Sequence, residues 1–116
     1  MVYKDLIVWQ KSMELVKEVY FLVKKLPKEE TYSLSDQMRR AVVSIPSNIA
    51  EGNGRKSQTE YARFLDIARG SQFEIETQLH ICIMLNFLTE KDTKKAFDLI
   101  EEIGKMLNAL IIKLGK

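Results

Sequence analysis

The sequence has a single cysteine, Cys82, and a single histidine, His80, among its 116 residues. One cysteine excludes an internal disulfide and a cysteine metal cluster, and Cys82 falls on an apolar stripe, as a small core residue would. A nucleophile that needs a histidine partner would have to use His80, which lies in the most apolar part of the chain. Di-iron bundles use two Glu-x-x-His pairs, whereas Glu76 and His80 are four residues apart and no second pair exists. We therefore expect no catalytic residue, no metal and no cofactor, and we predict that the protein is not an enzyme.

The chain also lacks a run of the roughly 18 uncharged apolar residues that a membrane span needs. Its first residues, M-V-Y-K-D, do not follow the charged-then-apolar layout of a signal peptide. We therefore expect a cytoplasmic protein with no membrane partner. The sequence Gly52-Asn53-Gly54-Arg55 lacks the spacing of a phosphate-binding P-loop, but its backbone N–H groups stay candidates for an anion at the start of the next helix.

Proline and glycine are scarce, with two and five copies, and they divide the chain into helical segments. Apolar residues recur every three or four positions, and no segment alternates as a strand would. Leu26-Pro27 and Gly52-Asn53-Gly54 are expected to end the first two helices, and Thr89 to cap the last one. We predict helices at about 5–25, 34–53, 58–88 and 91–114. The fold class is therefore all-α, with residues 1–116 forming a single up-down-up-down four-helix bundle domain.

One of the two prolines, Pro46, lies inside the predicted second helix. An internal proline deletes the hydrogen bond to the carbonyl four residues earlier, here that of Val42, at a cost of about 3 kcal/mol. Ser44 and Ser47 lie beside it and could bond the freed backbone. We therefore predict one kinked helix rather than two separate helices.

The predicted third helix carries two adjacent apolar stripes, so it needs partners on two sides. Ser57 and Glu60 are spaced as a capping box, which fixes its start. Towards its end the helix is apolar on every side, and in so small a chain we expect another subunit to cover part of it. The predicted subunit contacts are His80, Ile83, Met84 and Phe87.

The net charge of +2 is too small to indicate nucleic-acid binding, but the distribution of arginine is uneven. All five arginines lie between residues 39 and 69, a segment that contains six basic and three acidic residues. The candidate phosphate contacts are Arg39, Arg40, Arg55, Lys56, Arg63 and Arg69. Because arginine suits phosphate groups and ion pairs equally well, the alternative is a network with Glu51, Asp66, Glu74 and Glu76 that fixes helix and subunit register.

Two segments are distinctive enough to indicate a family: S-I-P-S-N-I-A-E-G-N-G-R at residues 44–55 and E-Y-A-R-F-L-D-I-A-R-G-S-Q-F-E-I-E-T-Q-L at residues 60–79. With these segments and D-L-I-V-W at residues 5–9, the chain resembles the bacterial four-helix bundle proteins of 23S rRNA intervening sequences. These are relatives of the accessory protein of diversity-generating retroelements. The resemblance implies a bundle that assembles into a ring-shaped homopentamer. It also implies a nucleic-acid role, since the retroelement relative works with a reverse transcriptase and its RNA.

The leading hypothesis is therefore a non-enzymatic homo-oligomer, a pentamer by the resemblance, that binds RNA or DNA or serves a ribonucleoprotein through its arginines. Its protein partner in that case would be a reverse transcriptase or another protein. The alternative is a structural or adaptor oligomer that binds a protein partner and has no nucleic-acid role, because its arginines are used in ion pairs.

Overall fold

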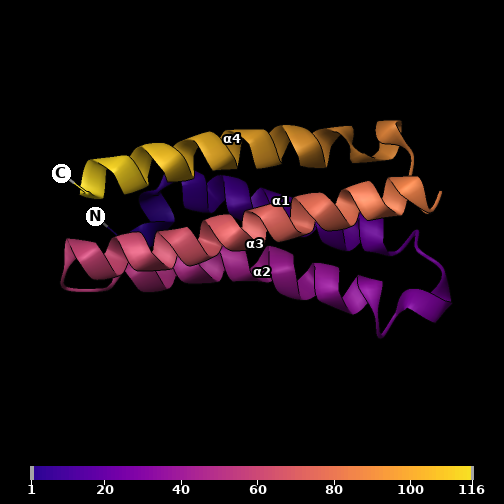
Figure 1. The fold of residues 1–116 in the computed structure, drawn as a ribbon, viewed down its shortest axis with the longest axis horizontal. Helices are drawn as coiled ribbons and strands as arrows, with labels where there is room; N and C mark the ends of the chain where they lie inside the picture. The colour runs from indigo at the N-terminus through magenta and orange to yellow at the C-terminus, as the bar shows by residue number, and fades with distance from the viewer. Residues whose placement is uncertain (1, 116) are drawn as a thin grey trace.

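Four long helices pack side by side in a computed structural model that describes residues 2–115. They are α1 (Ile7–Val23), α2 (Leu34–Asn53), α3 (Gln58–Met84) and α4 (Glu90–Leu114), and the short 3-10 turns η1 (Tyr3–Asp5) and η2 (Lys28–Glu30) precede α1 and α2. Each helix packs against the next one, and α4 closes the bundle against α1. The two ends of the chain lie at the same end of the molecule (Figure 1). The predicted all-α, up-down-up-down four-helix bundle is confirmed.

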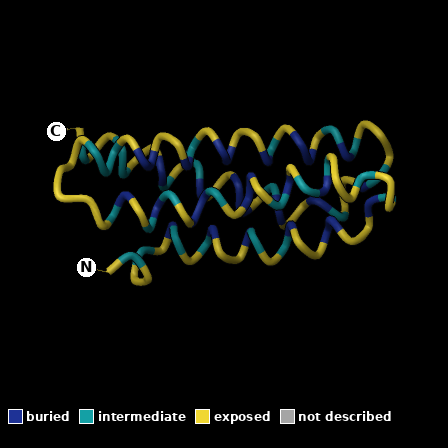
Figure 2. The backbone as a smooth tube through the Cα atoms, turned by 90° about the horizontal axis from the view of Figure 1, so that it is seen from below, coloured by how far each residue is buried: buried dark blue, intermediate teal, exposed yellow. Residues whose placement is uncertain are grey.

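The core runs along the whole length of the bundle, which measures 44 × 24 × 20 Å along its three principal axes. Buried residues recur on the inward side of every helix, and exposed residues occupy the outward side (Figure 2). This is the three-and-four spacing of the sequence expressed in space. The largest fully buried side chains include Leu15, Leu22, Met38, Ile45, Ile49, Leu65, Ile75, Leu79, Ile100, Ile103 and Leu107. Within residues 2–115, no helix has the length and apolar content to cross a membrane.

The first helix is shorter than predicted, because Leu6 has an extended backbone with φ −76° and ψ 125°. This residue separates η1 from α1, so the helix spans residues 7–23 rather than about 5–25. The separate turn places Tyr3 against Trp9 edge to face, with ring centroids 5.3 Å apart.

Helix α2 continues through Pro46, so the prediction of one helix is confirmed. The two serines do not act as predicted. The Ser44 hydroxyl accepts hydrogen bonds from Asn48 Nδ2 (2.9 Å) and from the Ser71 hydroxyl of α3 (2.8 Å). Ser44 therefore joins α2 to α3 rather than bonding the carbonyl that Pro46 leaves free. The bend expected at Pro46 stays a prediction.

Helix α3 ends at Met84, four residues before the predicted end, so the predicted boundary at residue 88 is wrong. Asn86 has a positive φ of 63°, a conformation that asparagine tolerates better than most residues. The Asn86 amide donates to the Ile83 carbonyl (3.0 Å) and the Phe87 amide to the Cys82 carbonyl (2.8 Å). These bonds form a Schellman motif, which satisfies the last carbonyls and turns the chain back towards the core.

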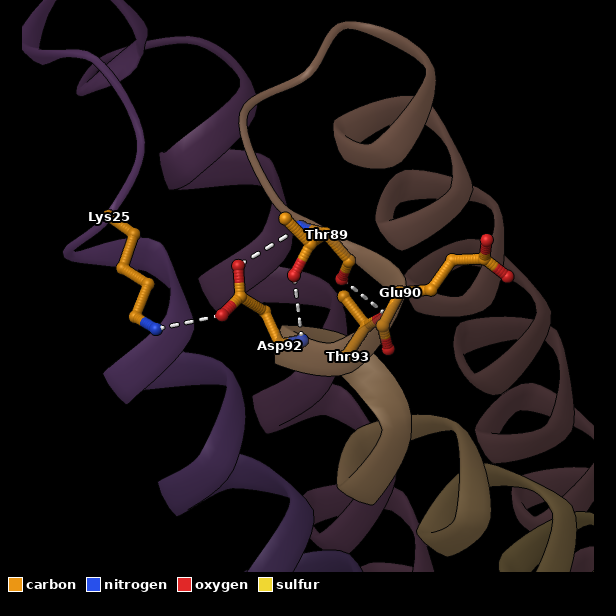
Figure 3. Close-up of polar contacts among 5 residues, drawn as sticks. All are labelled: Lys25, Thr89, Glu90, Asp92 and Thr93. Carbon is orange, nitrogen blue, oxygen red and sulfur yellow. Dashed lines mark hydrogen bonds and ion pairs between the residues drawn. The ribbon is translucent and has the colours of Figure 1, made fainter.

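The start of α4 follows the prediction, since Thr89 is its N-cap. The Thr89 hydroxyl accepts from the Asp92 amide, and the Asp92 carboxylate accepts from the Thr89 amide, each at 3.0 Å (Figure 3). Lys25, just beyond the end of α1, donates to the same carboxylate at 3.0 Å. These bonds hold the pKa of Asp92 below its usual value, with the Thr89 backbone amide as the largest cause. One carboxylate thus caps α4 and ties it to α1.

Candidate nucleic-acid interface

The six basic residues predicted to contact nucleic acid lie at three separate places on the bundle. One pair is in the first half of α2, three residues surround the turn between α2 and α3, and the last is further along α3. Because a helix rises about 1.5 Å per residue, the first pair and the turn are roughly 20 Å apart. The sequence therefore identified a set of residues that the fold divides into three groups: Arg39 and Arg40; Arg55, Lys56 and Arg63; and Arg69.

The turn between α2 and α3 places two guanidinium groups against one aromatic ring. The guanidinium carbons of Arg55 and Arg63 lie 4.7 and 4.8 Å from the centroid of Phe64. The two helices come this close because residue 52 is glycine: a Cβ there would lie 2.7 Å from the Cβ of Phe64. Gly52 therefore permits the packing that brings both cations to the same ring, where cation–π attraction holds them.

Each of these two arginines also has a carboxylate partner three or four residues earlier in the chain. Arg55 Nη2 lies 2.6 Å from Glu51 Oε2, and Arg63 Nε lies 3.1 Å from Glu60 Oε2. The hydrogen bond from Arg63 lowers the pKa of Glu60, and the pKa of Arg63 is raised in turn. The predicted capping box at Ser57 is consequently half formed. Its hydroxyl accepts from the Glu60 amide at 3.1 Å, while the Glu60 carboxylate turns to Arg63.

Arg69 is the most constrained of the predicted contacts, because it links α3 to α4. Its Nη1 donates to Asn108 Oδ1 at 2.5 Å, and its Nη2 lies 3.2 Å from Asp66 Oδ1. With partners on two helices, this guanidinium group would lose two contacts to bind a phosphate.

Arg39 and Arg40 are neighbours in sequence but have different surroundings. Arg40 Nε lies 3.2 Å from Asp36 Oδ2, and its side chain is 81% exposed. Arg39 donates instead to the Thr31 carbonyl, with its Nη2 at 3.2 Å. Among the residues that the structure describes, neither Arg39 nor Lys56 forms an ion pair with a carboxylate.

Some arginines do form the ion pairs of the alternative prediction, but only with carboxylates three or four residues away in the chain. Glu51 and Asp66 pair with arginines three or four residues away, as their spacing allows. Glu74 accepts instead from Gln78 Nε2 at 3.4 Å, and neither Glu74 nor Glu76 reaches an arginine in the described part of the chain. Exposed pairs of this kind contribute about 0 to 1 kcal/mol each, so a phosphate can compete for the guanidinium groups.

The four predicted subunit contacts differ in their exposure. Met84 is 70% exposed and His80 is exposed, with its ring 4.7 Å from that of Phe97. Ile83 is half-buried, and Phe87 packs against the core because the chain turns back after Asn86. Within the described residues no group of three His, Cys, Asp or Glu side chains is placed to hold a metal ion.

An exposed apolar strip on the outer face of α3 was missed by the sequence reasoning. Ile67 is 41% exposed, and Phe73 is 55% exposed. Between them lies Gly70, where a Cβ would meet no heavy atom within 4 Å. The signal in the sequence that could have indicated this strip was Gly70. A glycine in the middle of a helix lowers helix stability by about 1 kcal/mol relative to alanine, so its presence there points to another role.

Comparison with a solved structure and with a family model relates this chain to one protein family. A crystal structure from Bacteroides thetaiotaomicron VPI-5482, of a protein with unknown function from the S23 ribosomal protein family, superposes with a TM-score of 0.83. The two sequences are 28% identical, and the match covers 90% of this chain and 98% of that one. No curated protein matches. The family model of the 23S rRNA-intervening sequence protein matches residues 4–109. The chain therefore belongs to the 23S rRNA-intervening sequence protein family.

Proposed function

We propose that this protein is a non-enzymatic, homo-oligomeric helical bundle of the cytoplasm that binds RNA through arginines at its surface. The observation that carries the proposal is the turn between α2 and α3, where Arg55 and Arg63 flank Phe64 and Lys56 lies between them in sequence. Two guanidinium groups fixed by one ring form a preorganised receptor for phosphate oxygens.

Phosphate binding at this turn requires an exchange of anions. The side chains of Arg55 and Arg63 are 42% and 57% exposed, and their partners Glu51 and Glu60 lie four and three residues earlier in the chain. A phosphodiester can therefore take over the guanidinium groups while both carboxylates return to water. The ring of Phe64 stays in place, since the residue is only 9% exposed.

The same turn offers little for reading bases. Phe64 is covered by the two cations, and the Tyr61 hydroxyl accepts from Asn53 Nδ2 at 3.2 Å. We therefore expect contacts to the RNA backbone, with affinity set by charge and shape rather than by base sequence.

Self-association supplies the remaining affinity. The strip of Ile67, Gly70 and Phe73 on α3 suits the close approach of a second copy, since Gly70 leaves room for another backbone. Between residues 39 and 69, basic residues exceed acidic ones by three. A pentamer would present about fifteen such charges, so contacts that are weak singly add up.

The experiment is a titration of a labelled structured RNA, read by fluorescence anisotropy, together with the light-scattering mass of the free protein. The double variant Arg55→Gln and Arg63→Gln should weaken binding by about tenfold or more at unchanged mass, since it removes two charge-assisted contacts per subunit. The matched control is Lys94→Gln with Lys105→Gln, which removes two cations from exposed ion pairs on α4. Equal loss in both variants would refute a role for the turn.

A second candidate is an adaptor oligomer for a protein partner. The observation that favours it is that four of the five arginines have a carboxylate within 4.0 Å: Arg40, Arg55, Arg63 and Arg69. It predicts an intact oligomer that fails to bind RNA even at low salt.

A further inference from the structure

A basic pocket lies between the end of α1 and the start of α2. Figure 1 shows that the start of α2 is at the opposite end of the bundle from the turn between α2 and α3. The volume of the pocket is about 370 Å³, and the charged side chains that line it are Lys24, Lys28 and Arg39. No carboxylate from residues 2–115 lines it. Lys24 lies just beyond α1, Lys28 in η2 and Arg39 in α2, so three cationic side chains from separate segments line one cavity.

Two acidic residues next to lining residues in the sequence, Asp36 and Glu30, are engaged elsewhere. Asp36 pairs with Arg40 at 3.2 Å, and Glu30 accepts a hydrogen bond from the Ser33 hydroxyl at 2.9 Å. Arg39 is held by the Thr31 carbonyl, which fixes its side chain without neutralising the charge. The pocket therefore keeps an excess of positive charge that the fold does not compensate.

The first turn of α2 adds hydrogen-bond donors to this charge. Ser33 is the N-cap residue, but its hydroxyl binds Glu30 and makes no cap bond to α2. The backbone N–H of Ser35, in that uncapped turn, has no backbone acceptor among the described residues. Ser35 also lines the pocket, is only 3% exposed, and its hydroxyl makes no hydrogen bond within the described chain. A buried hydroxyl, a free amide and the positive end of a helix dipole together match the oxygens of an anion.

The other wall of the pocket is apolar and includes Tyr20 and Pro27. A cavity of about 370 Å³ is at the small end of the usual range for ligand sites, large enough for a phosphate with a compact organic group. The cavity is partly open to solvent, so a terminal phosphate can enter it with its organic group at the mouth, whereas the phosphate of an internal diester carries a chain on both sides.

We propose that this pocket binds a phosphate monoester, as carried by a mononucleotide or by the 5′ end of an RNA strand. Lys24, Lys28 and Arg39 neutralise the dianion, and Ser35 donates to one of its oxygens. The Tyr20 side of the pocket contacts the organic group. This site requires neither the oligomer nor the arginines at the turn between α2 and α3.

Isothermal titration calorimetry of the full chain tests the site with AMP, adenosine and inorganic phosphate as separate ligands. We expect AMP to bind and adenosine not to bind. The variants Arg39→Gln and Lys28→Gln should each weaken AMP binding by about tenfold or more. Lys105→Gln is the matched control, because it removes an exposed cation on α4, outside the pocket. Thermal melting checks that each variant is folded.

The outcomes separate the possible sources of the phosphate. Tighter binding of a 5′-phosphorylated RNA than of its 5′-hydroxyl form, lost in Arg39→Gln, assigns the site to RNA ends. Equal binding of the two RNAs, with AMP binding lost in Arg39→Gln, assigns it to free nucleotides. Equal affinities of AMP and adenosine, or equal loss in Arg39→Gln and Lys105→Gln, would overturn the proposal. The variant Arg55→Gln with Arg63→Gln should keep AMP binding. The pocket and the RNA-binding turn are therefore tested independently, and either proposal can fail without the other.

Discussion

The substitution of Gly52 by alanine tests whether close packing at the end of α2 builds the arginine site. A Cβ at this position would lie 2.7 Å from the Cβ of Phe64 and 3.2 Å from the carbonyl oxygen of Tyr61. Neither atom is the free end of a flexible side chain, so the two helices must move apart. Overpacking of this kind costs about 1 to 3 kcal/mol, whereas the gain in helix propensity from glycine to alanine is about 1 kcal/mol. We expect a net loss of stability of up to about 2 kcal/mol.

The matched control is Gly70→Ala, which has the same gain in propensity and no atom within 4 Å of the new Cβ. The assay is urea unfolding followed by circular dichroism at a fixed protein concentration, since self-association also changes apparent stability. Gly52→Ala should lower the unfolding midpoint, and its RNA affinity should fall because Phe64 shifts away from the two arginines. A Gly52→Ala protein as stable as Gly70→Ala would show that the packing at this turn is not tight.

Four further predictions concern the rest of the bundle. Thr89→Ala removes the N-cap of α4 and should destabilise the fold by about 1 kcal/mol in urea unfolding. Because the folded-state pKa of Asp92 is lowered, its contribution to stability is present above the unfolded pKa of about 3.9 and is lost as pH falls through the folded value. The difference in unfolding free energy between wild type and Asp92→Asn should therefore shrink below about pH 4. A difference that stays constant with pH would contradict this. Burial raises the pKa of Cys82 to about 11, so the native protein should react with a thiol reagent far more slowly than the unfolded chain. Phe73→Glu, on an exposed face, should leave the fold intact and lower the light-scattering mass; an unchanged mass would place the subunit contact elsewhere.

Local signals in the sequence predicted the starts of α3 and α4 well, but not the start of α1, where Leu6 interrupts the helix. Thr89 and Asp92 are three residues apart and satisfy each other's backbone and side-chain groups, so no distant residue decides the outcome. At Ser57 the same spacing produced only half of a capping box, because Arg63 competes for the Glu60 carboxylate. The end of α3 was misplaced because hydrophobicity continues to Leu88, whereas the Schellman turn depends on the φ of Asn86.

The arrangement of the basic residues was harder to predict, because it depends on contacts between helices. Arg63 is three residues from both Glu60 and Asp66, and only the fold shows that it pairs with Glu60. Nothing in the spacing of Arg55 and Arg63 indicates that they share Phe64, since that depends on the approach permitted by Gly52.

The most direct test of the RNA-binding proposal is the salt dependence of RNA affinity in the wild type and in Arg55→Gln with Arg63→Gln. We predict that log K falls linearly with log salt concentration, at roughly 0.7 to 0.9 per phosphate contact. The slope should become shallower in the double variant, because fewer counterions are released. An intact oligomer that does not bind RNA at low salt, or a double variant with the wild-type slope, would contradict the proposal.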